Sequence, residues 1–167
     1  LIYLAEKADE DEIREKAIFW LGQREGEKEL KFLVKVAKSD PSSDVREKEV
    51  FAISQMKSDD ATDELIDLAY HARENNAREK AIFWLGQKAS KKAVEALEDV
   101  VNKDDDEEVQ KQAVFALTQL PDHRGVPNLI KIARTHPSRE VRKKAIFWLG
   151  QSDDPRALDA LVEIMGK

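Results

Sequence analysis

Apolar residues recur along this chain at a spacing of 32 residues, and the recurring positions predict helices. The segment REKAIFWLGQ occurs at residues 14–23 and again, unchanged, at 78–87, and RKKAIFWLGQ follows at 142–151. Related segments lie halfway between these copies, at residues 46–55 and 110–119. Five copies at one fixed interval indicate a repeat architecture in which each copy forms the same structural unit.

A second set of apolar positions keeps the same interval and marks one face of another helix. Its first members are Leu1, Leu4 and Ala5, and its last are Leu161, Ile164 and Met165. Apolar residues at i, i+3 and i+4 are typical of one helical face. Each 32-residue unit therefore contains two helices, here named helix A for this set and helix B for the FWLGQ set. We expect an all-α chain of six A helices and five B helices.

Turn and capping residues separate the predicted helices. Ser42 and Ser138 are placed as N-caps of B helices, Asp104–Asp106 begin a third, and Pro155 suits the first turn of the last A helix. Because one helix pair cannot bury its apolar faces alone, the pairs stack on their neighbours. We therefore expect a single repeat domain over residues 1–167. Since the chain begins inside an A helix and ends after an A helix, we expect a fragment of a longer solenoid.

Three features together resemble HEAT repeats over the whole chain. They are Val45-Arg46 or Val141-Arg142 opening helix B, Ala-x-x-x-Leu-Gly within it, and residues 153–158 opening the next A helix. The short repeats are similar to those of the HEAT-like family that includes phycobilin lyases. The resemblance implies an α-solenoid, a HEAT-like superhelix of about eleven helices, with B helices on its concave surface. It implies little about function, because HEAT proteins mostly bind other macromolecules and a few are enzymes.

One element of longer HEAT repeats is only partly present. Asp40, six residues before Arg46, fits the Asp–Arg ladder that those repeats contain. The corresponding pairs in the other units do not fit it, so a continuous ladder is not expected.

A helical wheel of the first B helix separates a core face from a polar face. At about 100° per residue, Ala17, Leu21, Ile18 and Trp20 fall on the core arc that includes Ile13. Phe19 instead falls among polar residues, so it points away from the core of its own unit. By analogy with HEAT-like solenoids, the residues around it belong to the concave surface.

Three residue types recur around that position and form the candidate partner-binding surface. They are the phenylalanines Phe19, Phe51, Phe83, Phe115 and Phe147, the glutamines Gln23, Gln55, Gln87, Gln119 and Gln151, and the lysines Lys16, Lys48, Lys80 and Lys144. In one interpretation the phenylalanines only pack between adjacent B helices. In the other they form an apolar groove for a partner. An apolar ladder rimmed by ammonium groups suits an amphipathic helix with acidic flanks.

Two further features are interpreted as packing. Trp20, Trp84 and Trp148 alternate with Ala52 and Ala116, which predicts core positions where a large residue nests over a small one. A ligand-stacking platform is the alternative. Glu49 stands where the other units have Ala, and we expect it to pair with an Arg or Lys because an unpaired buried carboxylate is costly.

Composition and the search for catalytic groups narrow the function classes. The net charge of −6 counts against a general binder of nucleic acid or anionic membranes. No apolar run approaches the roughly 20 residues of a membrane span. The absence of cysteine excludes disulfides and thiolate chemistry. His71, His123 and His136 lack metal-ligand spacing, and the His-Glu dipeptides of HEAT-type di-iron hydroxylases are absent. We expect no catalytic residue, metal or cofactor.

The sequence therefore favours a non-enzymatic scaffold that binds a protein or peptide in its concave surface. Three alternatives stay open: a nucleic-acid-binding HEAT-like module, an enzyme or chromophore-handling protein like the phycobilin lyases, and a rigid spacer in a larger protein. The partner is not identified by the residues. By default we expect a soluble, cytoplasmic protein.

Overall fold

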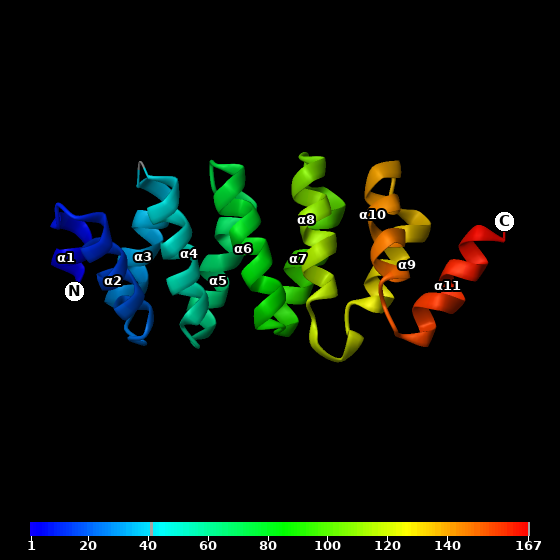
Figure 1. Ribbon diagram of the computed structural model, residues 1–167, viewed down its shortest axis with the longest axis horizontal. Coiled ribbons are helices and arrows are strands. Elements are labelled where there is room, and N and C mark those ends of the chain that lie inside the picture. The colour runs from blue at the N-terminus through cyan, green and yellow to red at the C-terminus, as the bar shows by residue number, and fades with distance from the viewer. Residues whose placement is uncertain (41, 167) are drawn as a thin grey trace. The chain divides into compact units, whose positions relative to one another are not determined.

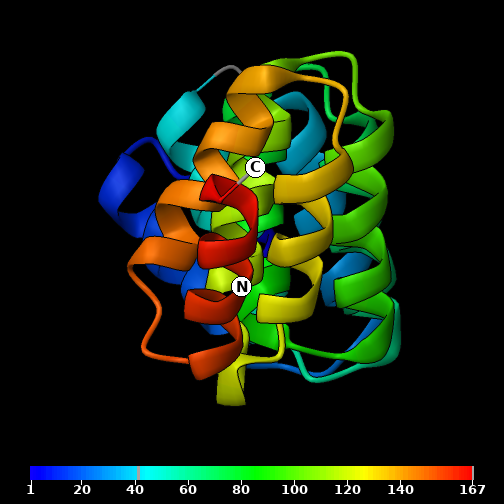
Figure 2. The same cartoon turned by 90° about the vertical axis from the view of Figure 1, so that its right-hand side faces the viewer.

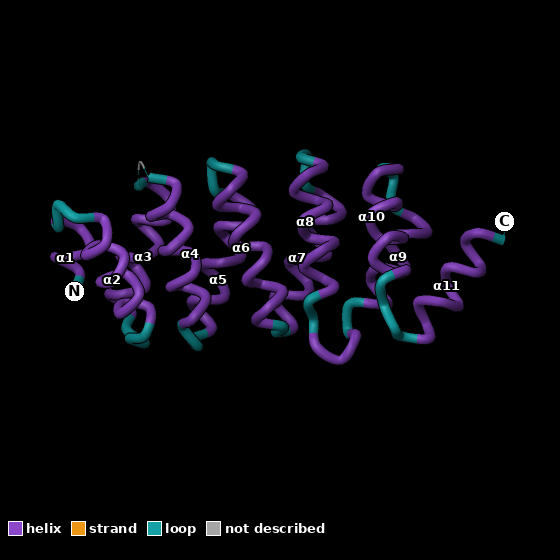
Figure 3. Tube along the Cα trace, viewed as in Figure 1, coloured by secondary structure: helices purple, strands orange, loops and turns teal. Residues whose placement is uncertain are grey.

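The computed structural model describes residues 1–40 and 42–166. Within these ranges eleven α-helices follow one another through short connections, and no strand is present (Figures 1 and 3). The A helices are α1 (Ile2–Lys7), α3 (Glu27–Ser39), α5 (Asp59–His71), α7 (Lys91–Lys103), α9 (Val126–Thr135) and α11 (Pro155–Met165). The B helices are α2 (Asp11–Gly22), α4 (Ser43–Gln55), α6 (Asn75–Lys88), α8 (Glu107–Thr118) and α10 (Arg139–Gly150). The predicted six A helices and five B helices are confirmed.

The capping residues identified in the sequence begin these helices. The hydroxyls of Ser42 and Ser138 accept hydrogen bonds from backbone N–H groups three residues later, at the starts of α4 and α10. The Asp106 carboxylate accepts two such bonds at the start of α8, and Pro155 occupies the first turn of α11. Each cap satisfies donors that a helix cannot pair internally, which explains why the helix bounds follow the sequence signals.

The helices form two compact units, Leu1–Trp84 and Leu85–Lys167. In the first unit, α2 packs against α1, α3 and α4, and α4 also contacts α5. In the second unit, α10 packs against α8, α9 and α11, and α7 packs against α8. Figure 2 shows α9 (yellow) and α10 (orange) side by side in that second unit. Each unit therefore has its own core between A and B helices.

Some neighbouring B helices approach each other through glycine. A Cβ atom added at Gly22 of α2 would lie 2.7 Å from the Ala52 carbonyl oxygen of α4. A Cβ added at Gly86 would lie 2.7 Å from the Ala116 carbonyl oxygen of α8. Only glycine allows helices to come this close, since real Cβ contacts are longer.

The other B helices meet through aromatic rings. The Phe51 ring centroid lies 5.2 Å from that of Trp84, and the Phe115 centroid lies 5.1 Å from that of Trp148. Glycine and aromatic contacts alternate along the chain. This alternation accounts for the greater similarity of sequence copies 64 residues apart than of copies 32 residues apart.

The prediction that the tryptophans lie in the core is wrong. Trp20 is 57% exposed, and Trp84 and Trp148 are half-buried. The buried side chains of α2 are Ala17, Ile18 and Leu21, so the centre of the core face is turned away from Trp20. The tryptophans pack sideways against phenylalanines on the B-helix face.

The expected salt bridge of Glu49 is also wrong. Glu49 is fully buried, and neither carboxylate oxygen has a hydrogen-bond partner among the described residues. The nearby guanidinium of Arg14 instead pairs with Asp40 at 2.5 Å. Burial raises the pKa of Glu49 from 4.5 to about 9, and the charge of Asp40 adds to this rise while Arg14 opposes it. Glu49 is therefore protonated at neutral pH.

Asp40 and Arg46 are in contact, but through the backbone. The Arg46 guanidinium donates to the Asp40 carbonyl oxygen at the end of α3. Gln110 and Arg142 donate to the carbonyl oxygens of Asp104 and His136 in the same way. This row of donors satisfies carbonyls at the ends of A helices, so it ties each of these A helices to the B helix that follows.

Candidate functional site

An apolar groove lies between the B helices α2 and α4 of the first unit. Its volume is about 280 Å³, and its apolar lining comes from Ile18, Phe19 and Phe51. Phe19 is 44% exposed, whereas Phe51 is half-buried. Both helices direct their small and branched residues to the core, which leaves the bulky phenylalanines on the opposite face. The groove brings two of the five predicted phenylalanines into one site.

Paired charges form the rim of this groove. The Lys16 ammonium lies 2.6 Å from the Glu12 carboxylate, and the Lys48 ammonium lies 3.8 Å from the Glu15 carboxylate. Hydrogen bonding from Lys16 lowers the pKa of Glu12 below its usual value. The lysines were predicted from the sequence, but their partners Glu12 and Glu15 were not. Because these glutamates also line the groove, its rim carries both signs of charge.

Each phenylalanine of the predicted row contacts a tryptophan ring. Phe19, Phe83 and Phe147 contact the tryptophan that follows them in the same helix, at centroid distances of 5.4, 5.0 and 5.0 Å. Phe51 and Phe115 contact the tryptophan of the next B helix. Packing between B helices thus covers part of the row, while Phe19 and Phe147 stay 44% and 53% exposed.

The predicted glutamines and remaining lysines lie on the surface. All five glutamines are exposed: Gln23, Gln55, Gln87, Gln119 and Gln151. Lys80 pairs with Glu47 at 2.6 Å. The Lys144 ammonium lies over two rings, 6.0 Å from the Phe147 centroid and 5.6 Å from the Trp148 centroid. The glutamine row does not line the groove of the first unit.

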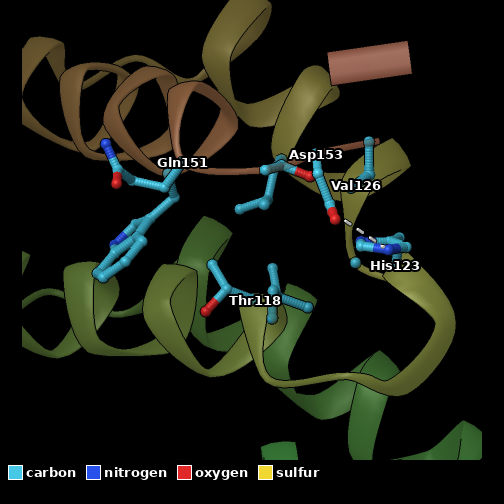
Figure 4. Close-up of a pocket in the computed structure, with 10 residues that line it drawn as sticks. Thr118, His123, Val126, Gln151 and Asp153 are labelled. Carbon is cyan, nitrogen blue, oxygen red and sulfur yellow. Dashed lines mark ion pairs between the residues drawn. The ribbon is translucent and has the colours of Figure 1, made fainter. Parts of the chain in front are cut away.

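A second pocket lies in the second unit, between the ends of α8 and α10 and the start of α9 (Figure 4). It has a volume of about 260 Å³ and an apolar lining that includes Leu117, Val126 and Leu129. The lining also includes Thr118, at the end of α8, and Gln151, which follows α10; both are labelled in Figure 4. This pocket was not expected from the sequence.

The connection between α8 and α9 shapes this second pocket. Asp122 and His123 have positive φ angles of 55° and 54°, so the chain turns in η1 (Pro121–His123) and α9 begins only at Val126. Position 125, just before α9, requires glycine, because a Cβ there would lie 1.9 Å from the Leu117 carbonyl oxygen. The segment Pro121-Asp122-His123 was the available signal, since the other units place a different turn here.

The histidines have separate structural environments. His123 lies 3.4 Å from the Asp153 carboxylate at the edge of the second pocket (Figure 4). His136 is buried, with Nε2 donating to the Val101 carbonyl oxygen at 2.8 Å and Nδ1 accepting from the Ser138 N–H. No group of three His, Cys, Asp or Glu side chains that could hold a metal ion is present among the described residues.

The fold and its B-helix face define an α-solenoid of two-helix repeats. The family model of HEAT repeats matches residues 1–78, 63–135 and 126–167. The chain therefore belongs to the HEAT repeat family. No curated protein matches the sequence. In the described part of the chain, no helix has both the length and the apolar character needed to cross a membrane.

Comparison with solved structures found similar chains at low sequence identity. Human deoxyhypusine hydroxylase in complex with glycerol is 20% identical with a TM-score of 0.61, and the match covers 97% of this chain and 65% of that one. The Escherichia coli protein YibA is 22% identical with a TM-score of 0.54, over 97% and 62% of the two chains. A chain of the CpcE–CpcF complex of phycocyanin lyase from Nostoc is 16% identical with a TM-score of 0.49, and the match covers 97% of this chain and 85% of that one. This chain thus spans less than two thirds of the first two proteins.

Proposed function

We propose that this chain is a non-enzymatic module that binds a peptide or protein segment on its B-helix face. The groove between α2 and α4 carries the proposal, because Phe19 and Phe51 line it and Phe19 is 44% exposed. Its volume of about 280 Å³ is close to that of the smaller ligand pockets of proteins. An exposed aromatic side chain in a concave apolar site is a typical anchor point for a partner.

The lining indicates the shape of the partner. A groove between two helices accepts an amphipathic helix that presents apolar side chains at i, i+3 or i+4, and i+7. The rim pairs, Glu12 with Lys16 and Glu15 with Lys48, carry no net charge. Apolar contacts therefore supply the affinity in this groove, and the rim charges orient polar flanks of either sign.

The lining also supports binding rather than catalysis. It consists of Ile18, two phenylalanines, two lysines and two glutamates, and each glutamate is paired with a lysine. Deoxyhypusine hydroxylase is an enzyme by its name, but the 20% identity of this chain to it concerns the fold alone. The chain contains no His-Glu dipeptide.

Selection of peptides followed by affinity measurement tests the proposal. A peptide library displayed on phage is selected on the immobilised chain, and the enriched peptides are labelled for fluorescence anisotropy. We expect Phe19→Ala and Phe51→Ala each to weaken binding about tenfold, because each removes an apolar contact of about 1.4 kcal/mol.

The matched control is Leu158→Ala, which removes an apolar side chain that is 65% exposed on α11, outside the groove. This control should bind with unchanged affinity. Circular dichroism shows whether each variant is folded. Unaltered affinity of a folded Phe19→Ala variant for all selected peptides would rule out the groove as the binding site.

A further inference from the structure

One row of the B helices changes its charge along the chain. It holds glutamate in the first three repeats, at Glu15, Glu47 and Glu79, and lysine in the last two repeats, at Lys111 and Lys143. Two of these glutamates pair with the lysine 33 residues later. They are Glu15, which pairs with Lys48, and Glu47, which pairs with Lys80, both within the compact unit of residues 1–84. The residue 33 positions before Lys144 is Lys111, so this carboxylate is missing there.

Lys144 consequently has no ion pair within the described residues, unlike the lysines around it. Lys111 pairs with Glu107 and Glu108 of its own helix at 3.6 and 2.6 Å, and Lys143 pairs with Glu140 at 2.8 Å. The Lys144 ammonium instead lies over the rings of Phe147 and Trp148. A cation–π contact leaves the remaining N–H donors of the ammonium available for an acceptor.

The rings around Lys144 form a continuous aromatic surface. Trp148 lies between Phe115 and Phe147, with centroid distances of 5.1 and 5.0 Å. Phe147 is 53% exposed, and Trp148 and Phe115 are half-buried. These four residues, Phe115, Lys144, Phe147 and Trp148, are named here the α8/α10 patch.

We propose that the α8/α10 patch binds an acidic protein segment, with a Glu or Asp carboxylate on Lys144 and a neighbouring apolar side chain on Phe147. The inference goes beyond the groove of the first unit, since it concerns a separate surface and assigns the charge of the partner. A partner carboxylate would give Lys144 the ion pair that Lys48 and Lys80 form with Glu15 and Glu47. Such charge-assisted hydrogen bonds are stronger than neutral ones.

The local charge balance agrees with an acidic partner. Residues 85–167 contain 14 basic and 14 acidic residues, whereas residues 1–84 contain 14 basic and 20 acidic residues. An acidic segment is therefore repelled less by the second unit. Single-stranded nucleic acid is the less favoured partner, because it carries a charge on every nucleotide and requires a track of cations. Among the described residues, the patch offers a single ammonium without a carboxylate, that of Lys144, because Lys111 and Lys143 of the same two helices are paired.

A defined pair of peptides tests the inference on the whole chain. The first is a short fluorescein-labelled peptide with one Phe between Glu residues, and the second has Gln in place of Glu. We expect the Glu peptide to bind about tenfold more tightly than the Gln peptide, and Lys144→Gln to abolish that difference. Phe147→Ala should weaken both peptides.

The control variant is Lys131→Gln, which removes an exposed ammonium from α9 of the same unit and should leave binding unchanged. Equal binding of the two peptides, or no effect of Lys144→Gln, overturns the inference. Weakening by Phe19→Ala would place the peptide in the groove of the first unit and overturn it as well. Tighter, Lys144-dependent binding of oligothymidylate would assign the patch to nucleic acid instead.

Discussion

Glu49 is the residue whose environment departs most from that of its counterparts. Ala81, Ala113 and Ala145 occupy the same place in other units and are fully buried. The Glu49 carboxyl group loses its hydration there and gains no hydrogen bond from residues 1–40 or 42–166. Such burial favours the neutral acid. The first unit therefore contains a site at which stability depends on pH.

Replacing Glu49 should remove this pH dependence. The pKa of Glu49 is about 9 in the folded chain and near 4.5 in the unfolded chain, so unfolding releases a proton between these values. The free energy of unfolding then falls as pH rises from about 4.5 to 9. We expect Glu49→Ala and the isosteric Glu49→Gln to gain about 2–4 kcal/mol more at pH 8 than at pH 5, relative to the unmodified chain.

Urea denaturation at the two pH values measures this difference. Glu49→Gln serves as the control for shape, because it keeps the side-chain volume and loses only the ionisation. If the stability gain of both variants is the same at pH 5 and pH 8, Glu49 is not a buried neutral acid.

Glycines in identical sequence contexts should respond differently to alanine. Gly22 and Gly150 both follow Ala-Ile-Phe-Trp-Leu and end a B helix. A Cβ at Gly22 meets the backbone of Ala52, whereas a Cβ at Gly150 meets no atom of the described residues within 4 Å. We expect Gly22→Ala to destabilise the chain by about 1–3 kcal/mol and Gly150→Ala to stabilise it slightly, by up to about 1 kcal/mol. Thermal denaturation measures both, and a loss of stability in Gly150→Ala would contradict the prediction.

At the scale of helices, B helices pair by two kinds of contact. The glycine contact lets two backbones approach, and the aromatic contact joins a phenylalanine to a tryptophan of the following B helix. Because Trp84 and Trp148 make this contact on the B-helix face, they need no place in the core. This is why a helix with the sequence of α2 is repeated in α6 and α10 but not in α4 or α8.

The aromatic contact predicts unequal effects of removing tryptophan. Trp148 contacts both Phe115 and Phe147, whereas Trp20 is 57% exposed and contacts Phe19 of its own helix. We expect Trp148→Ala to cost about 1–2 kcal/mol more than Trp20→Ala, since aromatic pairs add to the burial that is lost. Guanidinium denaturation followed by circular dichroism compares the two variants, and equal costs would show that the contact between helices adds no stability.

At the scale of the whole molecule, repeat proteins hold together through neighbouring units. Within each unit, helices contact helices close to them in sequence, as α10 contacts α8, α9 and α11. Stability in such a fold is approximately a sum of local terms, so damage in one unit need not spread to the other.

Hydrogen exchange of the Gly22→Ala variant tests this locality. We expect amide exchange to rise in α2 and α4, where the added methyl group strains the contact, and to remain unchanged in α9 and α10. Mass spectrometry of peptic fragments resolves these segments. A uniform rise along the chain would mean that both units open as one cooperative body.

Local signals in the sequence determined the helices of this protein and their bounds. Ser42, Ser138, Asp106 and Pro155 begin helices as predicted, because a cap satisfies backbone donors within a few residues and needs no distant partner. The 32-residue interval determined the HEAT-type architecture for the same reason, since equivalent positions take equivalent local conformations. The predicted rows of Phe and Lys likewise lie on the B helices, and the Gln row lies at the C-terminal ends of these helices. The role of the three rows in binding stays a prediction.

Only the tertiary structure decided what each side chain contacts across helices. Arg14 pairs with Asp40, and Glu49 has no hydrogen-bond partner among the residues that the structure describes. Trp148 lies against Phe115 rather than in the core. The predicted lysines form ion pairs in the first unit, whereas Lys144 in the second unit has no ion pair in the described part of the chain. These outcomes depend on competition among residues about 26 to 33 positions apart in sequence. The distances between side chains of different helices decide which pairs form. The periodicity of residues along one helix does not give these distances.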